Sequence, residues 1–135
     1  VKVLATDIST RVLQTARLGI YEKDRIEPLT PAQKQRYLVR TKSEGQWYEV
    51  AGTIRDVVIF AQLNLMGEWP VRGPLDFIFC RNVMIYFDKP TQERLVNRYF
   101  DLLDSGGLLF TGHSESLTGI HHRFEYVRPT IYAKP

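Results

Sequence analysis

Residues 75–88 of this 135-residue chain read LDFIFCRNVMIYFD. The first six, Leu75 to Cys80, form a short apolar run that follows a loop rich in glycine and proline, which is typical of a buried strand. Asp88 offers an N-cap, and Pro90 suits the first turn of a following helix. The stretch therefore predicts a strand and a helix joined by a loop that opens with Arg81.

Strands and helices alternate on both sides of this stretch. Further strands are predicted at Val1–Asp7, Val57–Gln62 and Leu108–Thr111, with a terminal hairpin of Phe124–Val127 and Thr130–Ala133. Helices are predicted from Ser9 or Thr10 to Gly19, from Thr30-Pro31 to about Tyr37, and from Asp88 to Gly106-Gly107. This alternation predicts an α/β fold with a doubly wound, mostly parallel sheet that ends in an antiparallel hairpin.

The polar stretch from Arg40 to Gly52 interrupts this alternation. Two glycines, Gly45 and Gly52, flank the apolar and aromatic residues of Trp47–Val50. Glycines around such a run are typical of a small strand pair.

Composition excludes several classes of protein. Hydrophobic residues make up 44% of the chain, so it is not a disordered polar tail. The longest apolar runs, such as Val83–Phe87, are far shorter than the roughly 20 residues that a bilayer-spanning helix needs. The 18 basic and 15 acidic residues are dispersed, which disfavours a nucleic-acid partner. The single cysteine, Cys80, excludes an internal disulfide and fits a reducing, cytoplasmic setting.

Ligands of doubly wound sheets bind beyond the carboxyl ends of the strands, so the residues that follow each strand are the first candidates for function. Asp7 ends the first predicted strand, where a carboxylate can accept hydrogen bonds from ribose hydroxyls or can cap the next helix. Asn64 and Leu65 follow the strand at Val57–Gln62. They could bind an adenine edge, or they could form a simple turn. No G-x-G-x-x-G phosphate loop is present in the 135 residues.

Arg81 and Tyr86 stand out in the loop after the strand Leu75–Cys80. If Arg81 is desolvated there, it needs an anionic partner, and recognition of a carboxylate is its natural task. The alternative is an internal salt bridge to Asp76 or Asp88. Cys80 has no basic residue at a fixed spacing, which favours a buried, unreactive thiol over a nucleophile.

The stretch Gly112–Ser116 resembles the G-x-S-x-G turn of serine hydrolases, with Ser114 as the nucleophile, but the final glycine is replaced by Ser116. The later histidines, His121 and His122, are adjacent and not at the spacing of a metal site. We therefore expect no metal ion, and a serine hydrolase is a minor alternative.

Four segments in this order resemble one family, the CheR chemotaxis receptor methyltransferases. They are Ala5–Ser9, Asn64–Met66, Phe79–Asp88 and Gly112–Ser116. The run CRNVMIYF within the third segment is long and specific. The resemblance covers essentially the whole chain, residues 1–135, as a partial catalytic domain, and it identifies the polar stretch at about 37–52 as the family's small β-subdomain.

The resemblance implies a Rossmann-like class I methyltransferase fold that uses S-adenosylmethionine and releases S-adenosylhomocysteine. The implied reaction methylates glutamate side chains of chemotaxis receptors to γ-glutamyl methyl esters. Asp7 would hold the ribose hydroxyls, and Asn64 and Leu65 would bind the adenine end. Arg81 and Tyr86 would lie beside the transferable methyl group and the incoming carboxylate, so that Arg81 contacts both cofactor and substrate.

The implied partner is the cytoplasmic domain of a receptor, including its tail peptide in some members of the family, and the implied location is peripheral to receptor arrays. The alternative is a non-catalytic module that binds a receptor or a peptide.

By the same resemblance, the chain lacks the first strand of the family's sheet and its glycine-rich cofactor loop. We expect that strand to belong between Val1–Asp7 and Val57–Gln62, and its loss to leave two unpaired strand edges. A strand-exchanged dimer is one way to fill such a gap. We also expect the 135 residues alone to bind cofactor weakly and to be inactive.

Overall fold

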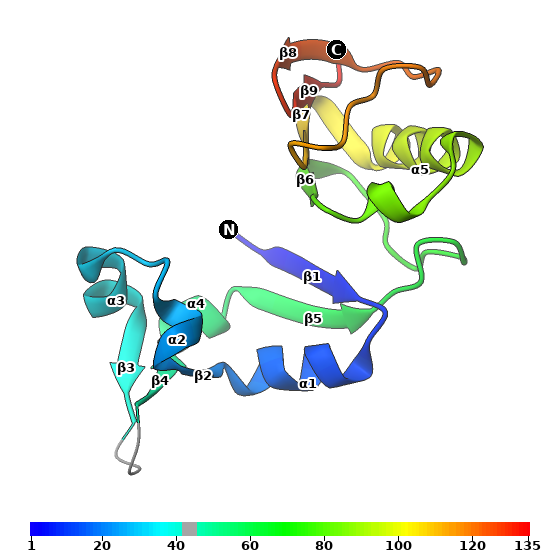
Figure 1. The fold of residues 1–135 in the computed structure, drawn as a ribbon. Helices are drawn as coiled ribbons and strands as arrows, with labels where there is room; N and C mark the ends of the chain where they lie inside the picture. The colour runs from blue at the N-terminus through cyan, green and yellow to red at the C-terminus, as the bar shows by residue number, and fades with distance from the viewer. Residues whose placement is uncertain (42–45) are drawn as a thin grey trace. The chain divides into compact units, whose positions relative to one another are not determined.

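The computed structural model describes residues 1–41 and 46–135, which fall into two compact units, Val1–Gly67 and Glu68–Pro135 (Figure 1). Within these residues, no helix has both the length and the apolar composition needed to cross a membrane.

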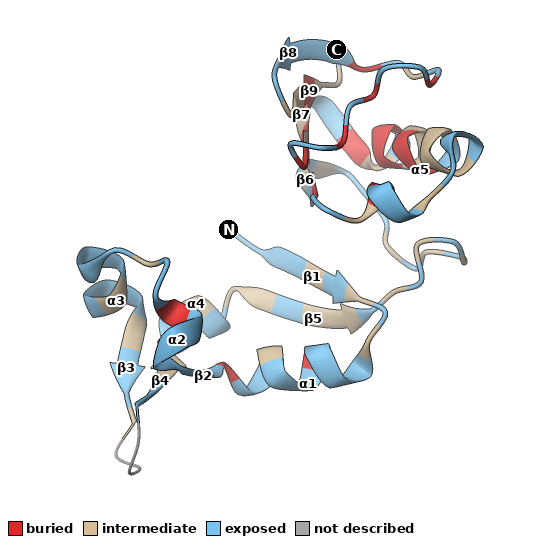
Figure 2. Ribbon diagram, in the orientation of Figure 1, coloured by how far each residue is buried: buried red, intermediate tan, exposed pale blue. Residues whose placement is uncertain are grey.

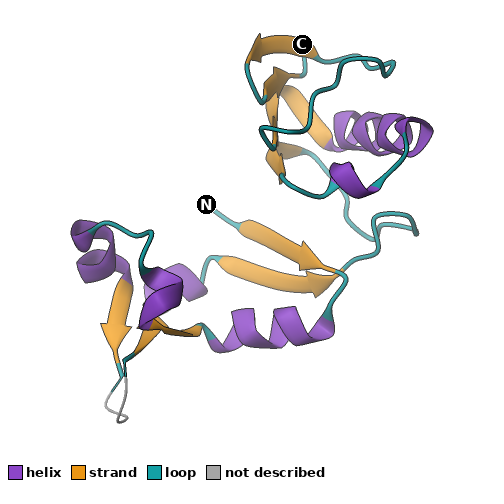
Figure 3. Ribbon diagram, in the orientation of Figure 1, coloured by secondary structure: helices purple, strands orange, loops and turns teal. Residues whose placement is uncertain are grey.

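A parallel strand pair forms the centre of the first unit. Strand β1 (Val3–Asp7) pairs with β5 (Val58–Gln62), and the register places Asp7 opposite Gln62. Helix α1 (Thr10–Leu18) connects to this pair and packs against β5 and β1 (Figure 3). The Ser9 hydroxyl accepts a hydrogen bond from the Val12 N–H at the start of α1, as an N-cap residue does.

The register of β1 and β5 overturns one expectation. Every residue of β1 faces a residue of β5, so no strand is missing between Val3–Asp7 and Val58–Gln62. The two runs are adjacent strands, because the backbone groups of one form hydrogen bonds directly with those of the other. A strand-exchanged dimer is therefore not needed to pair this edge of β1.

A second, antiparallel sheet follows α1. It has the order β2 (Ile20–Glu22), β4 (Trp47–Val50), β3 (Leu38–Arg40), and β4 is its central strand. A strand pair is present as β3 and β4, but β3 begins at Leu38, before the predicted stretch, and β2 joins the pair as a strand that the sequence did not predict. Residues 42–45 of the polar stretch lie outside the described residues. Three short helices accompany this sheet: α2 (Lys23–Ile26), α3 (Pro31–Tyr37) and α4 (Gly52–Arg55).

The second unit contains the other parallel pair and the terminal hairpin. Its sheet has the order β6 (Leu75–Cys80), β7 (Leu103–Thr111), β9 (Ile131–Ala133), β8 (Glu125–Arg128). Strands β6 and β7 are parallel, while β9 is antiparallel to both β7 and β8, as expected for the hairpin. A 3₁₀ turn, η1 (Met84–Tyr86), and helix α5 (Lys89–Leu102) lie between β6 and β7.

Helix α5 supplies much of the core of the second unit. Leu95 and Val96 are at most 1% exposed, and Leu109 of β7 is completely buried. Figure 2 shows buried residues along α5. Asp88 caps the helix, because its carboxylate accepts a hydrogen bond from the Thr91 N–H at 2.9 Å. The predicted cap of this helix is confirmed.

The predicted end of this helix at Gly106-Gly107 is wrong. Helix α5 ends at Leu102, and Leu103 already has extended backbone and lies in β7. The glycines instead shape the strand. Gly106 has a φ of 79°, and a Cβ on Gly107 would lie 2.8 Å from the Asp104 carbonyl oxygen.

Gly19 ends α1 with a φ of 64°, in the left-handed region. We expect Gly19→Ala to lower the free energy of unfolding by about 1 kcal/mol, since a Cβ there is strained by the backbone angle. A Cβ would meet no atom closer than 3.5 Å, so the cost does not come from a clash. Urea unfolding measures the effect. Gly52→Ala is the matched control, because Gly52 has open space around it; equal stability of the two variants would contradict the assignment.

Candidate functional site

The carboxyl end of the β1–β5 pair brings two predicted site residues to one edge. Asp7 ends β1, and the Leu63 N–H, just after β5, donates to the Asp7 carbonyl oxygen at 3.0 Å. Asn64 follows directly. This edge is where doubly wound sheets bind ligands.

The Asp7 side chain is half-buried and has capacity left to bind a ligand. Its Oδ1 accepts a hydrogen bond from the Ser9 N–H at 2.8 Å, and its Oδ2 has no partner among residues 1–41 and 46–135. The alternative prediction that Asp7 caps α1 is wrong, because Ser9 is the N-cap. A carboxylate fixed through one oxygen, with the other available, fits a ligand that offers hydroxyl groups.

Asn64 forms the turn that was predicted as the alternative to ligand binding. Its Oδ1 accepts from the Met66 N–H at 2.9 Å, and its carbonyl oxygen accepts from the Gly67 N–H at 3.0 Å. Asn64 is exposed and Leu65 is half-buried. The turn leaves the amide Nδ2 of Asn64 as the side-chain group able to reach a ligand.

Arg81 and Tyr86 occupy the loop between β6 and α5 in the second unit. Both side chains are exposed, Tyr86 to 80%. Residues of this unit therefore do not desolvate Arg81. The alternative salt bridge from Arg81 to Asp76 or Asp88 is also absent, since Arg81 takes part in no ion pair within the described part of the chain.

The Glu115 side chain binds backbone N–H groups of this loop, a role that the sequence did not predict. The residue is only 6% exposed. Its Oε2 accepts from the N–H groups of Asn82 at 2.8 Å and Gly112 at 2.7 Å, and its Oε1 accepts from those of Val83 at 2.8 Å and Met84 at 2.7 Å. Burial alone would raise the pKa of this carboxyl, but the four N–H groups lower it below its ordinary value.

The backbone around Glu115 is built to admit the carboxylate. A Cβ on Gly112 would lie 2.6 Å from Glu115 Oε2, so only glycine leaves room there. Asn82 has a φ of 60°, a conformation that asparagine tolerates better than most residues. The signal available in the sequence was an acid placed three residues after a glycine at a strand end.

The two alternative nucleophiles lack an activating partner. Ser114 is exposed and has no hydrogen bond to a histidine in the described part of the chain. Cys80 is buried and accepts a hydrogen bond from the Tyr99 hydroxyl at 3.2 Å. Burial raises the pKa of the Cys80 thiol to about 11, so it stays protonated near neutral pH, as predicted for an unreactive thiol. Among the described residues, no three His, Cys, Asp or Glu side chains gather around a common point where a metal ion could bind.

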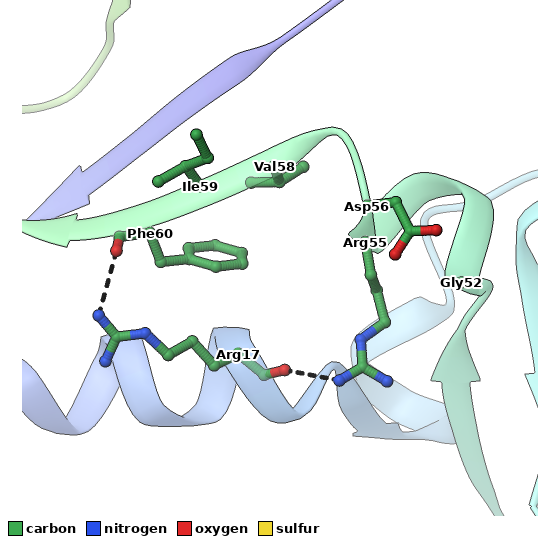
Figure 4. A pocket seen from close by; sticks show the side chains of 7 residues that line it. All are labelled: Arg17, Gly52, Arg55, Asp56, Val58, Ile59 and Phe60. Atoms are coloured by element: carbon green, nitrogen blue, oxygen red, sulfur yellow. Dashed lines mark hydrogen bonds between the residues drawn. The ribbon is translucent and has the colours of Figure 1, made fainter.

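An open pocket of about 490 Å³ lies elsewhere in the first unit, beside the start of β5 (Figure 4). Its two arginines already bind protein groups. Arg17 donates to the Phe60 carbonyl oxygen at 3.1 Å, and Arg55 donates to the Arg17 carbonyl oxygen at 2.9 Å and to Glu49. These bonds connect α1 to β5 and to α4. The two arginines that line the pocket therefore have a structural role. It lies at the opposite end of β5 from Asn64.

Comparison with known proteins places these features in one family. The family described as "CheR methyltransferase, SAM binding domain" matches residues 1–133. The chain is 48% identical over 133 residues to a chemotaxis protein methyltransferase of Klebsiella aerogenes, covering 97% of this chain and 46% of that protein. It is 46% identical over 134 residues to the Escherichia coli protein of the same name, covering 98% and 47%. A chemotaxis protein methyltransferase 2 of Pseudomonas aeruginosa is 44% identical over 135 residues, covering 98% and 48%.

The chain thus spans about half the length of the curated relatives that it matches. The match nevertheless runs through both units and through every segment that carries the site residues. It follows that the chain belongs to the CheR methyltransferase family, as part of its SAM-binding domain.

Proposed function

We propose that this chain is part of an enzyme that transfers a methyl group from S-adenosylmethionine to glutamate carboxylates of chemotaxis receptors, forming γ-glutamyl methyl esters. The family match and the names of the relatives support this assignment. The observation that carries it is the meeting of Asp7 and Asn64 at the carboxyl end of β1 and β5.

In this proposal the first unit binds the nucleoside of the cofactor. The available Oδ2 of Asp7 accepts hydrogen bonds from the ribose hydroxyls, while the Ser9 N–H holds Oδ1 in place. The Asn64 amide and Leu65 lie at the adenine end. A carboxylate after one strand and an amide after the next are suited to a ligand that has a ribose and a base.

The second unit orients the substrate. A glutamate side chain is ionised near neutral pH, so no general base is needed. The sulfonium cofactor supplies an electrophilic methyl group when bound. Arg81 offers a planar pair of donors that matches a carboxylate, and Tyr86 offers one further hydroxyl donor. These contacts orient the carboxylate so that one of its oxygens can attack the methyl group.

The small antiparallel sheet is the proposed receptor-docking subdomain, centred on residues 37–52. Its outer strands, β2 and β3, each pair on one side only, with β4, in the described part of the chain. An extended receptor tail peptide can therefore add as a further strand. This contact would keep the protein at receptor arrays.

Calorimetric titration of S-adenosylhomocysteine tests the cofactor site. It is carried out on residues 1–135 and on the protein extended to the length of the curated relatives. We expect clear binding by the longer protein and weak binding by residues 1–135. In the longer protein, Asp7→Asn should lower the affinity about tenfold, because it keeps the bond from Ser9 but removes the charge that faces the ribose.

Asp24→Asn is the matched control for this titration, because Asp24 is exposed on α2. Equal affinities of the two variants would contradict the role of Asp7. Failure of the longer wild-type protein to bind would favour a non-catalytic module that binds a receptor or a peptide.

A further inference from the structure

We propose that Glu115 is a positioning residue, which together with Gln92 fixes the loop that carries Arg81 and Tyr86 in the geometry needed for methyl transfer. The inference rests on the function proposed above and adds to it a part of the machinery that does not touch the substrate. The residue is buried, so it acts only through the loop.

The loop is held from two sides by side chains that bind its peptide groups. On one side, the Glu115 carboxylate accepts three consecutive N–H groups, those of residues 82–84. On the other side, the half-buried Gln92 donates from Nε2 to the carbonyl oxygens of Met84 at 2.9 Å and Phe87 at 3.0 Å. The backbone on both sides of Tyr86 is therefore fixed.

Both anchors are attached to packed elements of the second unit. Gln92 lies on α5, whose Leu95 and Val96 are packed in the core. Glu115 follows the end of β7, where the Thr111 hydroxyl donates to its carbonyl oxygen at 2.9 Å. The position of the loop is thus set by α5, through Gln92, and by the sheet, through Glu115.

Arg81 and Tyr86 need such a fixed backbone because their side chains are exposed in this unit. A misplacement of about 1 Å in a catalytic group can slow a reaction by roughly a hundredfold. The left-handed φ of 60° at Asn82, directly after Arg81, is held by the bond from its N–H to Glu115.

A carboxylate at position 115 can accept hydrogen bonds from all four N–H groups, and an amide cannot. Each Glu115 oxygen accepts two N–H groups. In Glu115→Gln, the NH₂ group would face two of these donors and accept from neither. The substitution preserves size while removing at least two of the four bonds.

The test compares Glu115→Gln with Glu125→Gln in the protein extended to the length of the relatives. Glu125 is exposed on β8, so this control removes the same charge from the surface. We expect kcat per folded molecule to fall about a hundredfold in Glu115→Gln. We expect the Kd for S-adenosylhomocysteine to change much less, because the contacts of Asp7 and Asn64 are untouched and only that of Arg81 is affected. A purely structural role would lower the folded fraction and leave kcat per folded molecule unchanged, and that result would overturn the proposal.

Two further measurements decide the remaining cases. If Glu115→Gln does not fold, Gln92→Met removes the opposite anchor; it should lower kcat at least about tenfold, and an unchanged kcat would overturn the proposal. Amide exchange at residues 82–84 should accelerate in Glu115→Gln but not in Glu125→Gln. If the wild-type protein transfers no methyl group, the proposed function fails, and the exchange result alone then decides whether Glu115 fixes the loop.

Discussion

Arg81→Ala should reduce methyl transfer to background, a loss of about a thousandfold, in the protein extended to the length of its relatives. The guanidinium is the cation of the loop after β6, and no acidic side chain of the described residues forms an ion pair with it. In the proposed reaction it orients a carboxylate that must keep its attacking oxygen directed at the methyl group. Removing such an oriented charge from a reaction centre typically costs about two to three powers of ten in rate.

Transfer of a labelled methyl group to receptor glutamates measures this effect. Arg128→Ala is the matched control, because Arg128 is exposed on β8 of the same unit. Tyr86→Phe should reduce the rate only about tenfold, since it removes a single neutral donor. Unchanged turnover of Arg81→Ala would refute the assignment of Arg81.

Glu115→Gln should lower the free energy of unfolding by about 3 kcal/mol at pH 7, because it leaves buried N–H groups without acceptors. Denaturant unfolding at several pH values measures this. The pKa of the Glu115 carboxyl in the folded protein lies below the ordinary value of 4.5. A group with a lowered folded pKa stabilises the protein above its unfolded pKa, and the stabilisation is lost as the pH falls through its folded pKa. The difference between wild type and variant should therefore be constant above about pH 5 and should narrow below pH 4.5.

Glu125→Gln controls for general acid effects and should stay within about 0.5 kcal/mol of wild type, since Glu125 is exposed. If the stability difference between wild type and Glu115→Gln stays constant down to about pH 2, the carboxylate is not the stabilising species.

The sequence predicted those features whose signals are local. Ser9, Gly19 and Asp88 mark helix ends, and the apolar residues of Leu75–Cys80 mark a strand, because caps and buried runs depend on near neighbours. The end of α5 was misplaced by four residues, because Gly106-Gly107 is a helix stop by composition but bends a strand here. Strand β2 was missed because three residues carry too little periodicity.

The site shows the same division between local and distant signals. Asp7 and Asn64 could each be predicted to lie at the carboxyl edge of the sheet, because Asp7 ends one strand and Asn64 follows the end of another. Glu115 could not, since its partners at residues 82–84 lie more than thirty positions away in the sequence. The predicted place of a missing strand failed for a related reason: strand order is a property of long-range pairing, and the register of β1 with β5 decides it.

The Glu115 anchor binds peptide groups and makes no side-chain contact at residues 82–84 through these bonds. These hydrogen bonds therefore do not depend on which side chain stands at the three positions, although the positive φ limits the choice at Asn82 and burial limits it at Met84. Proline is the clear exception, because it has no N–H to offer. Laboratory evolution can thus vary an exposed side chain of this loop, such as Ile85, for different acceptor proteins without changing the backbone bonds that support the loop.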